Sequence, residues 1–283
     1  MTQQVPNSLL AFDGGALGHR NRIINGSMSI DQRNTGASLS SGLNVITYTL
    51  DRWSVAASGA AVTVQRLGSA GAYYLNVTGA ASNTSVNIRH RIEAANIADL
   101  AGQTVTVSFV CSSSTATTLA VTAGYASVAD NFSTVTAIGT VNKTINAVGN
   151  TYNVQFTLPA NAANGVELIF GLTNFTSGAF SITNVQLENG SVNTPFERLP
   201  VGLDLAMCQR YFEVVTGASI TTRPAYTPYA YKVTKRATPT LALFSGSVAG
   251  ANYAPTNSDS FTCPDSVVAT GTSGWSISAT AEL

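Results

Sequence analysis

Charged residues are scarce in this chain of 283 residues. Asp, Glu, Lys and Arg make up 10% of it, where an ordinary soluble domain has roughly 25%. The 14 basic residues balance the 14 acidic ones. Because clustered charge is absent, the chain has no field that would attract nucleic acid or an anionic membrane, and we expect neither as a partner. Ser, Thr, Asn, Gly and Ala must supply most of the surface.

Cysteine and histidine are also rare. Cys111, Cys208 and Cys263 are widely spaced and odd in number, which predicts neither a disulfide framework nor a metal-binding pattern; we expect small buried hydrophobes. Of the two histidines, His19 precedes the first strand pattern, and His90 is in phase with apolar strand residues. We therefore expect His90 in a core or interface, with no metal site, no cofactor and no catalytic triad.

Long apolar runs and targeting segments are missing too. No stretch reaches the roughly 18 apolar residues of a membrane-spanning helix, so membrane insertion is not expected. The first ten residues, MTQQVPNSLL, have neither the basic nor the apolar region of a signal peptide. Residues 1–20 show no sustained periodicity, which predicts an extended N-terminal arm.

Recognisable catalytic motifs are absent. A glycan hydrolase needs only two acids about 5–10 Å apart, but none of the acids here lies in a known motif, and the chain has no β-helix repeat. Asp13–Gly18 is rich in glycine but has no strand before it and no helix after it, unlike a phosphate-binding loop. We predict that the protein is not an enzyme, and glycan depolymerase is the less favoured alternative.

What the sequence does have is apolar alternation with a period of two. Apolar residues make up 45% of it, and turn residues separate the alternating segments. One helical turn is expected at 94–100. These patterns predict an all-β jelly-roll β-sandwich over 21–200. The expected strands are 23–26, 48–55, 61–67, 73–78, 85–93, 104–111, 118–125, 143–148, 151–158, 166–172 and 179–187.

The pattern breaks at 197–200, and a second domain is expected over 201–283. Residues 202–212 carry apolar residues at helical spacing, which predicts one short helix. The remainder predicts a small β-rich domain. Lys232, Lys235 and Arg236 form a basic cluster that we expect on a solvated strand edge. The expected strands of this domain are 211–216, 225–231, 240–244, 260–263 and 273–281.

Several ordered motifs resemble a known family. Asn21–Gly26, Tyr48–Trp53, Arg91–Phe109, Val185–Arg198 and Leu205–Phe212 are similar, in this order, to segments of bacteriophage tail-fibre and receptor-binding proteins that contain a carbohydrate-binding-module-like jelly roll. The resemblance covers nearly the whole chain.

The sequence departs from this family at three places. The family often has an aromatic residue at the position of Asp31 and a tryptophan near Val110 and Cys111. Related modules often carry an aspartate for a structural calcium ion near Thr183 and Asn184, so no metal site is expected here.

The resemblance implies a structural protein of a phage virion, made in the host cytoplasm. As a tail-fibre or receptor-binding component, it would form a homotrimer and mediate host attachment. The arm at 1–20 would dock to other virion proteins, and the β-domains would contact a host-surface glycan. A head-fibre or decoration protein of the capsid, with the same fold, is the alternative.

Aromatic residues supply the candidate contacts, because tyrosine and tryptophan are preferred at recognition surfaces. Scattered tyrosines at 73, 74 and 125 allow a sugar-stacking platform but are more often half-buried packing. A denser cluster in the C-terminal domain is predicted to contact a receptor or glycan, with packing in a trimer interface as the favoured alternative. Its members are Tyr226, Tyr229, Tyr231, Tyr253 and Trp275. Structural roles are predicted for Trp53, Arg210 and Tyr211.

Overall fold

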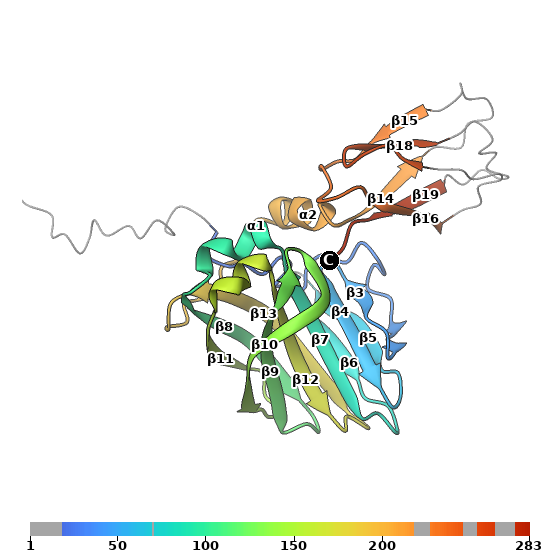
Figure 1. The fold of residues 1–283 in the computed structure, drawn as a ribbon. Helices are drawn as coiled ribbons and strands as arrows, with labels where there is room; N and C mark the ends of the chain where they lie inside the picture. Colours follow the sequence, from blue (N-terminus) through green and yellow to red (C-terminus); the bar gives the residue numbers. More distant parts are fainter. Residues whose placement is uncertain (1–18, 70, 218–226, 246–253, 264–274) are drawn as a thin grey trace, which may run out of the picture.

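Two facing β-sheets form the larger part of the protein (Figure 1). The computed structural model describes residues 19–69, 71–217, 227–245, 254–263 and 275–283. In the first sheet the strand order is β1 (Leu39–Ser40), β5 (Thr63–Ser69), β6 (Ala72–Thr78), β13 (Ala179–Asn189), β8 (Thr104–Ser113) and β11 (Asn150–Thr157). In the second sheet it is β10 (Asn131–Thr144), β9 (Thr118–Val128), β12 (Val166–Thr173), β7 (Ser85–Ile92), β4 (Trp53–Ser58) and β2 (Gly42–Leu43), with β3 (Thr47–Leu50) also paired to β4.

A single core fills the space between these sheets. Alternation along the strands sends one set of side chains inward, as on β7, where Ile88 is fully buried and Arg89 lies on the wet face. Phe109 of the first sheet meets Phe170 of the second edge to face, with ring centroids 5.1 Å apart. The predicted all-β jelly-roll sandwich is therefore confirmed.

The sandwich has two unlike ends. Short helices gather at one end, which we call the near end: α1 (Ala94–Ile97), η2 (Ala98–Leu100), η3 (Ala160–Asn164) and α2 (Val201–Gln209). The opposite end, called the far end, consists of loops. They are residues 59–62, 79–84, 114–117, 145–149 and 174–178.

A small β-rich unit follows α2. One sheet has the order β14 (Phe212–Gly217), β19 (Trp275–Thr280), β16 (Thr240–Ser245), and the other has the order β15 (Thr227–Ala230), β18 (Ser260–Cys263), β17 (Ala254–Pro255). The described part of its core is small, with Tyr231, Phe261, Ile277 and Ala279 buried together. No helix in the described ranges is both long and apolar enough to cross a membrane.

Polar and charged side chains join the small unit to the near end. The Asn25 N–H donates to Asp204 Oδ1 of α2 at 2.9 Å. Near the C-terminus, Glu282 forms ion pairs with Arg33 and Arg52 of the sandwich. These contacts are largely shielded from solvent, because the side chains of Arg52 and Glu282 are only 1% and 6% exposed.

Three strand predictions are wrong in detail. Residues 23–26 form a turn, with Asn25 at φ 57°, although the segment lies beside β13. The strand expected at 48–55 is divided by a tight turn at Asp51–Arg52 into β3 and β4. Of the strand expected at 143–148, only residues 143–144 are strand, as the end of β10, which begins at Asn131; residues 145–148 belong to a far-end loop. On this edge strand the burial does not alternate regularly, so periodicity could not identify it.

Two predictions in the C-terminal part also need correction. The helix ends at Gln209, and Phe212 already begins β14, so the predicted helix is too long. Lys235 is not on a solvated edge. Its side chain is fully buried, and its ammonium pairs with Glu213 at 2.5 Å. The ammonium also donates to the backbone oxygen of Gln209, and these two partners together offset the cost of burying the charge.

Candidate functional site

The outer face of the first sheet brings polar side chains from distant strands into register. Ser181 of β13 lies opposite Asn76 of β6 on one side and opposite Ser112 of β8 on the other. Tyr74 lies two residues before Asn76, on the same face. Their inward neighbours, such as Leu75, are fully buried, so the face that carries Tyr74 is turned toward solvent.

A shallow depression of about 270 Å³ lies on this face. The half-buried ring of Tyr74 is its one aromatic group. Ser181 Oγ donates to Asn76 Oδ1 at 3.2 Å, which holds two polar groups of this face in place. The residues that line the depression are Tyr74, Val110, Cys111, Ser112, Gly149, Ser181, Ile182 and Thr183.

The lining residues define the chemistry of the depression. None of them is charged, while hydroxyls and an aromatic ring stand side by side. Cys111 is buried, and burial raises the pKa of its thiol to about 12. The thiolate is therefore scarce at neutral pH, and Cys111 is no nucleophile there. The depression suits a neutral, polyhydroxylated ligand with an apolar face.

The departures from the family pattern have visible structural consequences. Val110 lines the depression near the position where the family often has a tryptophan. Asp31 organises the turn that follows it: its carboxylate accepts hydrogen bonds from the Asn34 and Gly36 N–H groups at 3.0 and 2.7 Å. Asp31 does not line the depression. The aromatic ring in the depression comes from Tyr74 and not from the position of Asp31.

The predicted aromatic cluster is only partly within the described residues. Tyr226 and Tyr253 lie outside them, and so does the side chain of Trp275. Tyr231 is 7% exposed. Tyr229 and Tyr231 each stack on Phe261, with ring centroids 5.3 and 5.6 Å apart. Receptor contact by this cluster stays a prediction, and the described rings take part in packing.

The residues expected to be structural lie in the core or at the near end. Trp53 is fully buried and donates from Nε1 to the Asn25 carbonyl at 3.0 Å, and its ring lies 4.7 Å from that of His90, tilted by 50°. Burial, together with the nearby Arg52 charge, lowers the pKa of His90 well below its usual value, so the ring stays neutral.

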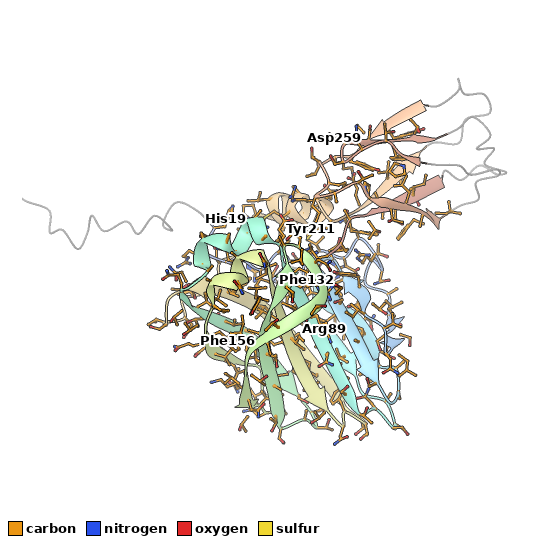
Figure 2. The ribbon with its side chains drawn as sticks, in the orientation of Figure 1. His19, Arg89, Phe132, Phe156, Tyr211 and Asp259 are labelled. Atoms are coloured by element: carbon orange, nitrogen blue, oxygen red, sulfur yellow. The ribbon has the colours of Figure 1, made fainter. Side chains whose placement is uncertain are left out.

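Tyr211 and Arg210 lie where α2 meets the sandwich. Figure 2 labels Tyr211 at this junction. The Tyr211 side chain is fully buried, and the guanidinium of Arg52 covers its ring. Arg210 pairs with Glu93 at 3.1 Å, directly before α1. Among the described residues, no group of three or more His, Cys, Asp or Glu could hold a metal ion.

The two ends of the described chain lie at the same end of the sandwich. Figure 2 shows His19 at the near end, on the same side as Tyr211. Residue 19, the first described residue, therefore lies at the same end of the sandwich as α2. The part farthest from this junction is the loop-built far end (Figure 1).

Sequence reasoning named Tyr74 but missed its neighbours. Asn76, Ser112, Ser181 and Thr183 lie on alternating strands, and alternation alone would have placed them on wet faces. Only the strand pairing shows that they share one face. Asn76 and Ser181 are 105 residues apart in the chain.

Comparison with known proteins found similar solved structures but no match to a family model or to a curated protein sequence. A family 4 carbohydrate-binding module matches 59% of this chain and 99% of its own, with 17% identity and a TM-score of 0.39. A family 61 module in complex with β-1,4-galactotriose matches 60% of this chain and 99% of its own, with 11% identity and a TM-score of 0.36.

One similar structure comes from a phage. It is the enzymatically active domain of tailspike protein 4 of bacteriophage CBA120, which matches 60% of this chain but only 22% of its own length. The identity is 15% and the TM-score 0.39. These values are too low to transfer a ligand, an activity or an assembly from any of the three proteins to this chain.

Proposed function

We propose that this protein is a non-catalytic, glycan-binding structural component of a phage virion, and that it binds host-surface glycan through the depression around Tyr74. The observation that carries the binding proposal is the depression itself, where one half-buried aromatic ring stands among uncharged hydroxyl-bearing side chains. The virion role is supported by the ordered motifs from Asn21 to Phe212.

The chemistry of the depression fits a sugar ring. A tyrosine face is apolar and matches the C–H face of a pyranose. Ser112, Ser181 and Thr183 line the depression. The Ser181 and Thr183 hydroxyls already donate to Asn76 Oδ1 and to the Tyr73 carbonyl, so they can offer a ligand their oxygens as acceptors. Such groups hydrogen-bond sugar hydroxyls without the desolvation cost of an ion. A shallow, open depression gives a weak single contact.

Weak contacts become useful when several copies bind together. A homotrimer would present three such faces, and linked binding events raise the overall affinity by 10²–10⁴ (an order-of-magnitude range) without any new contact. Trimerisation is part of the proposal, and light scattering tests it. A trimer has three times the chain mass of 29.3 kDa, and a stable monomer would contradict this part.

The binding experiment compares two variants of one face. Tyr74→Ala removes the ring, while Leu67→Ala alters the residue paired with Tyr74 across the strands, which does not line the depression. Wild type and the two variants are applied to an array of neutral bacterial polysaccharides and of gluco-, galacto- and manno-oligosaccharides. We expect wild type and Leu67→Ala to bind the same glycans and Tyr74→Ala to lose them. Equal binding by Tyr74→Ala, or no glycan bound by the wild type, would contradict the proposal.

The same array separates binding from hydrolysis. Released reducing ends are measured after incubation of the wild type with each bound polysaccharide. A non-catalytic protein leaves the reducing-end signal unchanged. Oligosaccharide release that persists in a repurified sample would show a depolymerase instead.

A further inference from the structure

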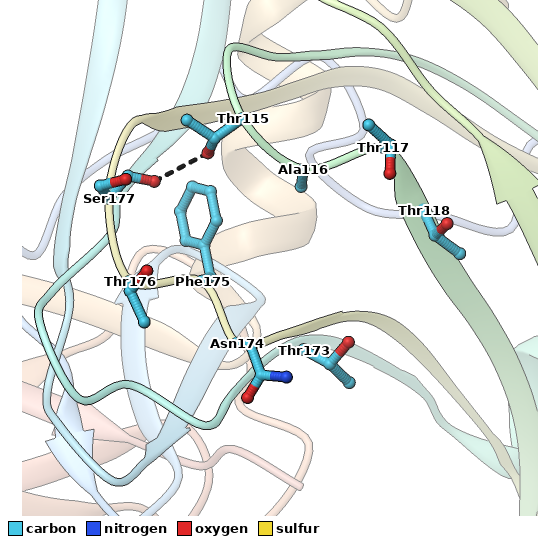
Figure 3. A pocket seen from close by; sticks show the side chains of 9 residues that line it. All are labelled: Thr115, Ala116, Thr117, Thr118, Thr173, Asn174, Phe175, Thr176 and Ser177. Carbon is cyan, nitrogen blue, oxygen red and sulfur yellow. Dashed lines mark hydrogen bonds between the residues drawn. The ribbon is translucent and has the colours of Figure 1, made fainter.

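A second pocket lies at the far end of the sandwich, between two loops (Figure 3). Its volume is about 370 Å³, within the roughly 300–1,000 Å³ of small-molecule sites. One wall is the β8–β9 connection with the first residue of β9, and the other is the end of β12 with the loop that follows. The lining residues are Thr115, Ala116, Thr117, Thr118, Thr173, Asn174, Phe175, Thr176 and Ser177.

Both walls are fixed before any ligand arrives. Phe175 is only 2% exposed and belongs to the main core, so it anchors its loop from below. The Asn174 N–H donates to the Thr84 carbonyl at 2.9 Å. Across the two walls, Thr115 Oγ1 donates to the Ser177 carbonyl at 2.8 Å, which joins the loops to each other. A pocket held in this way loses little conformational entropy when it binds a ligand.

Several polar groups of the pocket are not used by the protein itself. Within the described part of the chain, five exposed side chains of the lining make no hydrogen bond to another residue. Figure 3 shows two of them on one wall and three on the other. They are Thr117, Thr118, Thr173, Asn174 and Thr176. Together they offer four hydroxyls and one amide, which can both donate and accept.

We infer that this far-end pocket is a second binding site, for one or two rings of a neutral saccharide. The inference rests on the proposed glycan-binding function but uses different residues from the Tyr74 depression. The free hydroxyls and the amide match a ligand made of hydroxyls. No lining residue carries a charge, so an acidic or basic sugar would lose its hydration without gaining an ion pair.

The place of the pocket supports this role. It lies at the end of the sandwich away from α2 and from the exit of residue 19, as Figures 1 and 2 show. An assembly held together through the near end therefore leaves the far-end pocket open. A glycan chain would meet it from outside, end-on, while the Tyr74 face would bind from the side.

Methyl NMR of the full-length protein tests the site, because threonine methyl groups line it. The protein is labelled at threonine methyls and titrated separately with D-glucose, D-galactose, N-acetyl-D-glucosamine and the anionic N-acetylneuraminate. We expect at least one neutral sugar to shift the methyl signals of Thr117, Thr118, Thr173 and Thr176 in a saturable way. N-acetylneuraminate should shift them more weakly.

Matched variants assign the effect to the pocket. Thr118→Val with Thr176→Val keeps the shape and removes two hydroxyls, and we expect about tenfold weaker binding, read from the Thr117 and Thr173 signals. Thr136→Val, at an exposed position of β10 outside the pocket, is the control and should bind as wild type. Thr176→Tyr, which fills the pocket from an exposed position, is the second test if the double variant does not fold.

Three results would overturn the site: no neutral sugar shifts these signals, the Thr118/Thr176 variant binds as well as wild type, or N-acetylneuraminate binds as tightly as the neutral sugars. Tyr74→Ala distinguishes this failure from failure of the proposed function. If the two sites are separate, Tyr74→Ala loses glycan on the array but keeps the sugar-induced shifts at Thr117. If Tyr74→Ala loses both the glycan binding on the array and the sugar-induced shifts at Thr117, the far-end pocket is not an independent site.

Discussion

The guanidinium carbon of Arg52 lies 3.6 Å from the centre of the Tyr211 ring, so a turn of the sandwich is stacked on a residue just beyond the end of α2. The same guanidinium pairs with Glu282 and donates to the Arg91 carbonyl. Burial by itself lowers the pKa of Arg52, but the surrounding acidic groups, Glu282 first among them, raise the pKa above its usual value, so the charge is kept within a buried junction. The small unit and the sandwich are joined by a cation that solvent barely reaches.

Removal of this cation should be costly. Arg52→Ala leaves the buried Glu282 with Arg33 as its remaining ion-pair partner among the described residues, and breaking a buried pair costs about 3–5 kcal/mol. Chemical denaturation measures the free energy of unfolding. Arg22→Ala is the control, because its pair with Asp99 is partly exposed and contributes about 1 kcal/mol or less. A similar small loss for both variants would show that the junction does not depend on Arg52.

The buried pair of Lys235 and Glu213 predicts a non-additive result. Lys235→Met leaves the Glu213 carboxylate buried without its cation, and we expect a loss of several kcal/mol, about 3–5. Glu213→Gln in the same chain removes the stranded charge and keeps an acceptor for the Lys232 N–H. The double variant should therefore be more stable than Lys235→Met alone in denaturant unfolding. A double variant that is less stable would contradict this account.

Two glycines should respond in opposite directions to alanine. A Cβ at Gly26 would lie 2.2 Å from the Val185 carbonyl oxygen, so Gly26→Ala must displace the segment beside β13. We expect a loss of at least about 2 kcal/mol, as for other backbone clashes. Gly202 lies in α2 with nothing near its Cβ position, and Gly202→Ala should stabilise the helix by up to about 1 kcal/mol. Thermal unfolding of both variants measures the difference, and a stable Gly26→Ala protein would contradict the close approach.

Stability should depend on pH through Asp51. Burial raises the pKa of this carboxyl to about 6, against the lowering effects of Arg33 and of two hydrogen bonds from Gln32. The folded state therefore binds a proton more readily than the unfolded state between about pH 4 and pH 6. The contribution of Asp51 to stability is thus fully present at low pH and is lost as the pH rises through this window.

His90 acts in the opposite direction, since its lowered pKa makes the folded state lose stability as the pH falls below the usual histidine pKa.

The comparison of wild type with Asp51→Asn isolates the contribution of the Asp51 carboxyl to the pH dependence, because His90 is present in both proteins. Denaturant unfolding between pH 4.5 and pH 7 should show that the free energy of unfolding of wild type minus that of the variant decreases as the pH rises, by roughly 2 kcal/mol over this range. A difference that is independent of pH would contradict the raised pKa.

Local patterns predicted the sandwich but could not predict the site. Alternation identified β7 and β8 correctly because one face of each lies against the core. It failed at Asp51–Arg52, where a tight turn continues the same alternation, and on β10, whose outer edge is exposed.

The decisive contacts join residues that are far apart in the sequence. Arg52 and Glu282 are 230 residues apart, and the polar face around Tyr74 is assembled from separate strands by their register. No window along the chain contains that information. The burial of Lys235 was missed for the same reason, because Lys235 lies in the connection between β15 and β16 and its partner Glu213 lies on β14.

The separation of the two ends has a consequence for how this protein can change over generations. The near end depends on buried ions, so most substitutions at Arg52, Glu282 or Tyr211 would be lost with the fold. The far-end loops carry no charged side chain, and most of their residues are exposed or half-buried, apart from anchors such as Phe175 and Ile145. Substitutions in these loops are therefore expected to leave the buried junction intact, so this end of the sandwich can vary in sequence without a new scaffold.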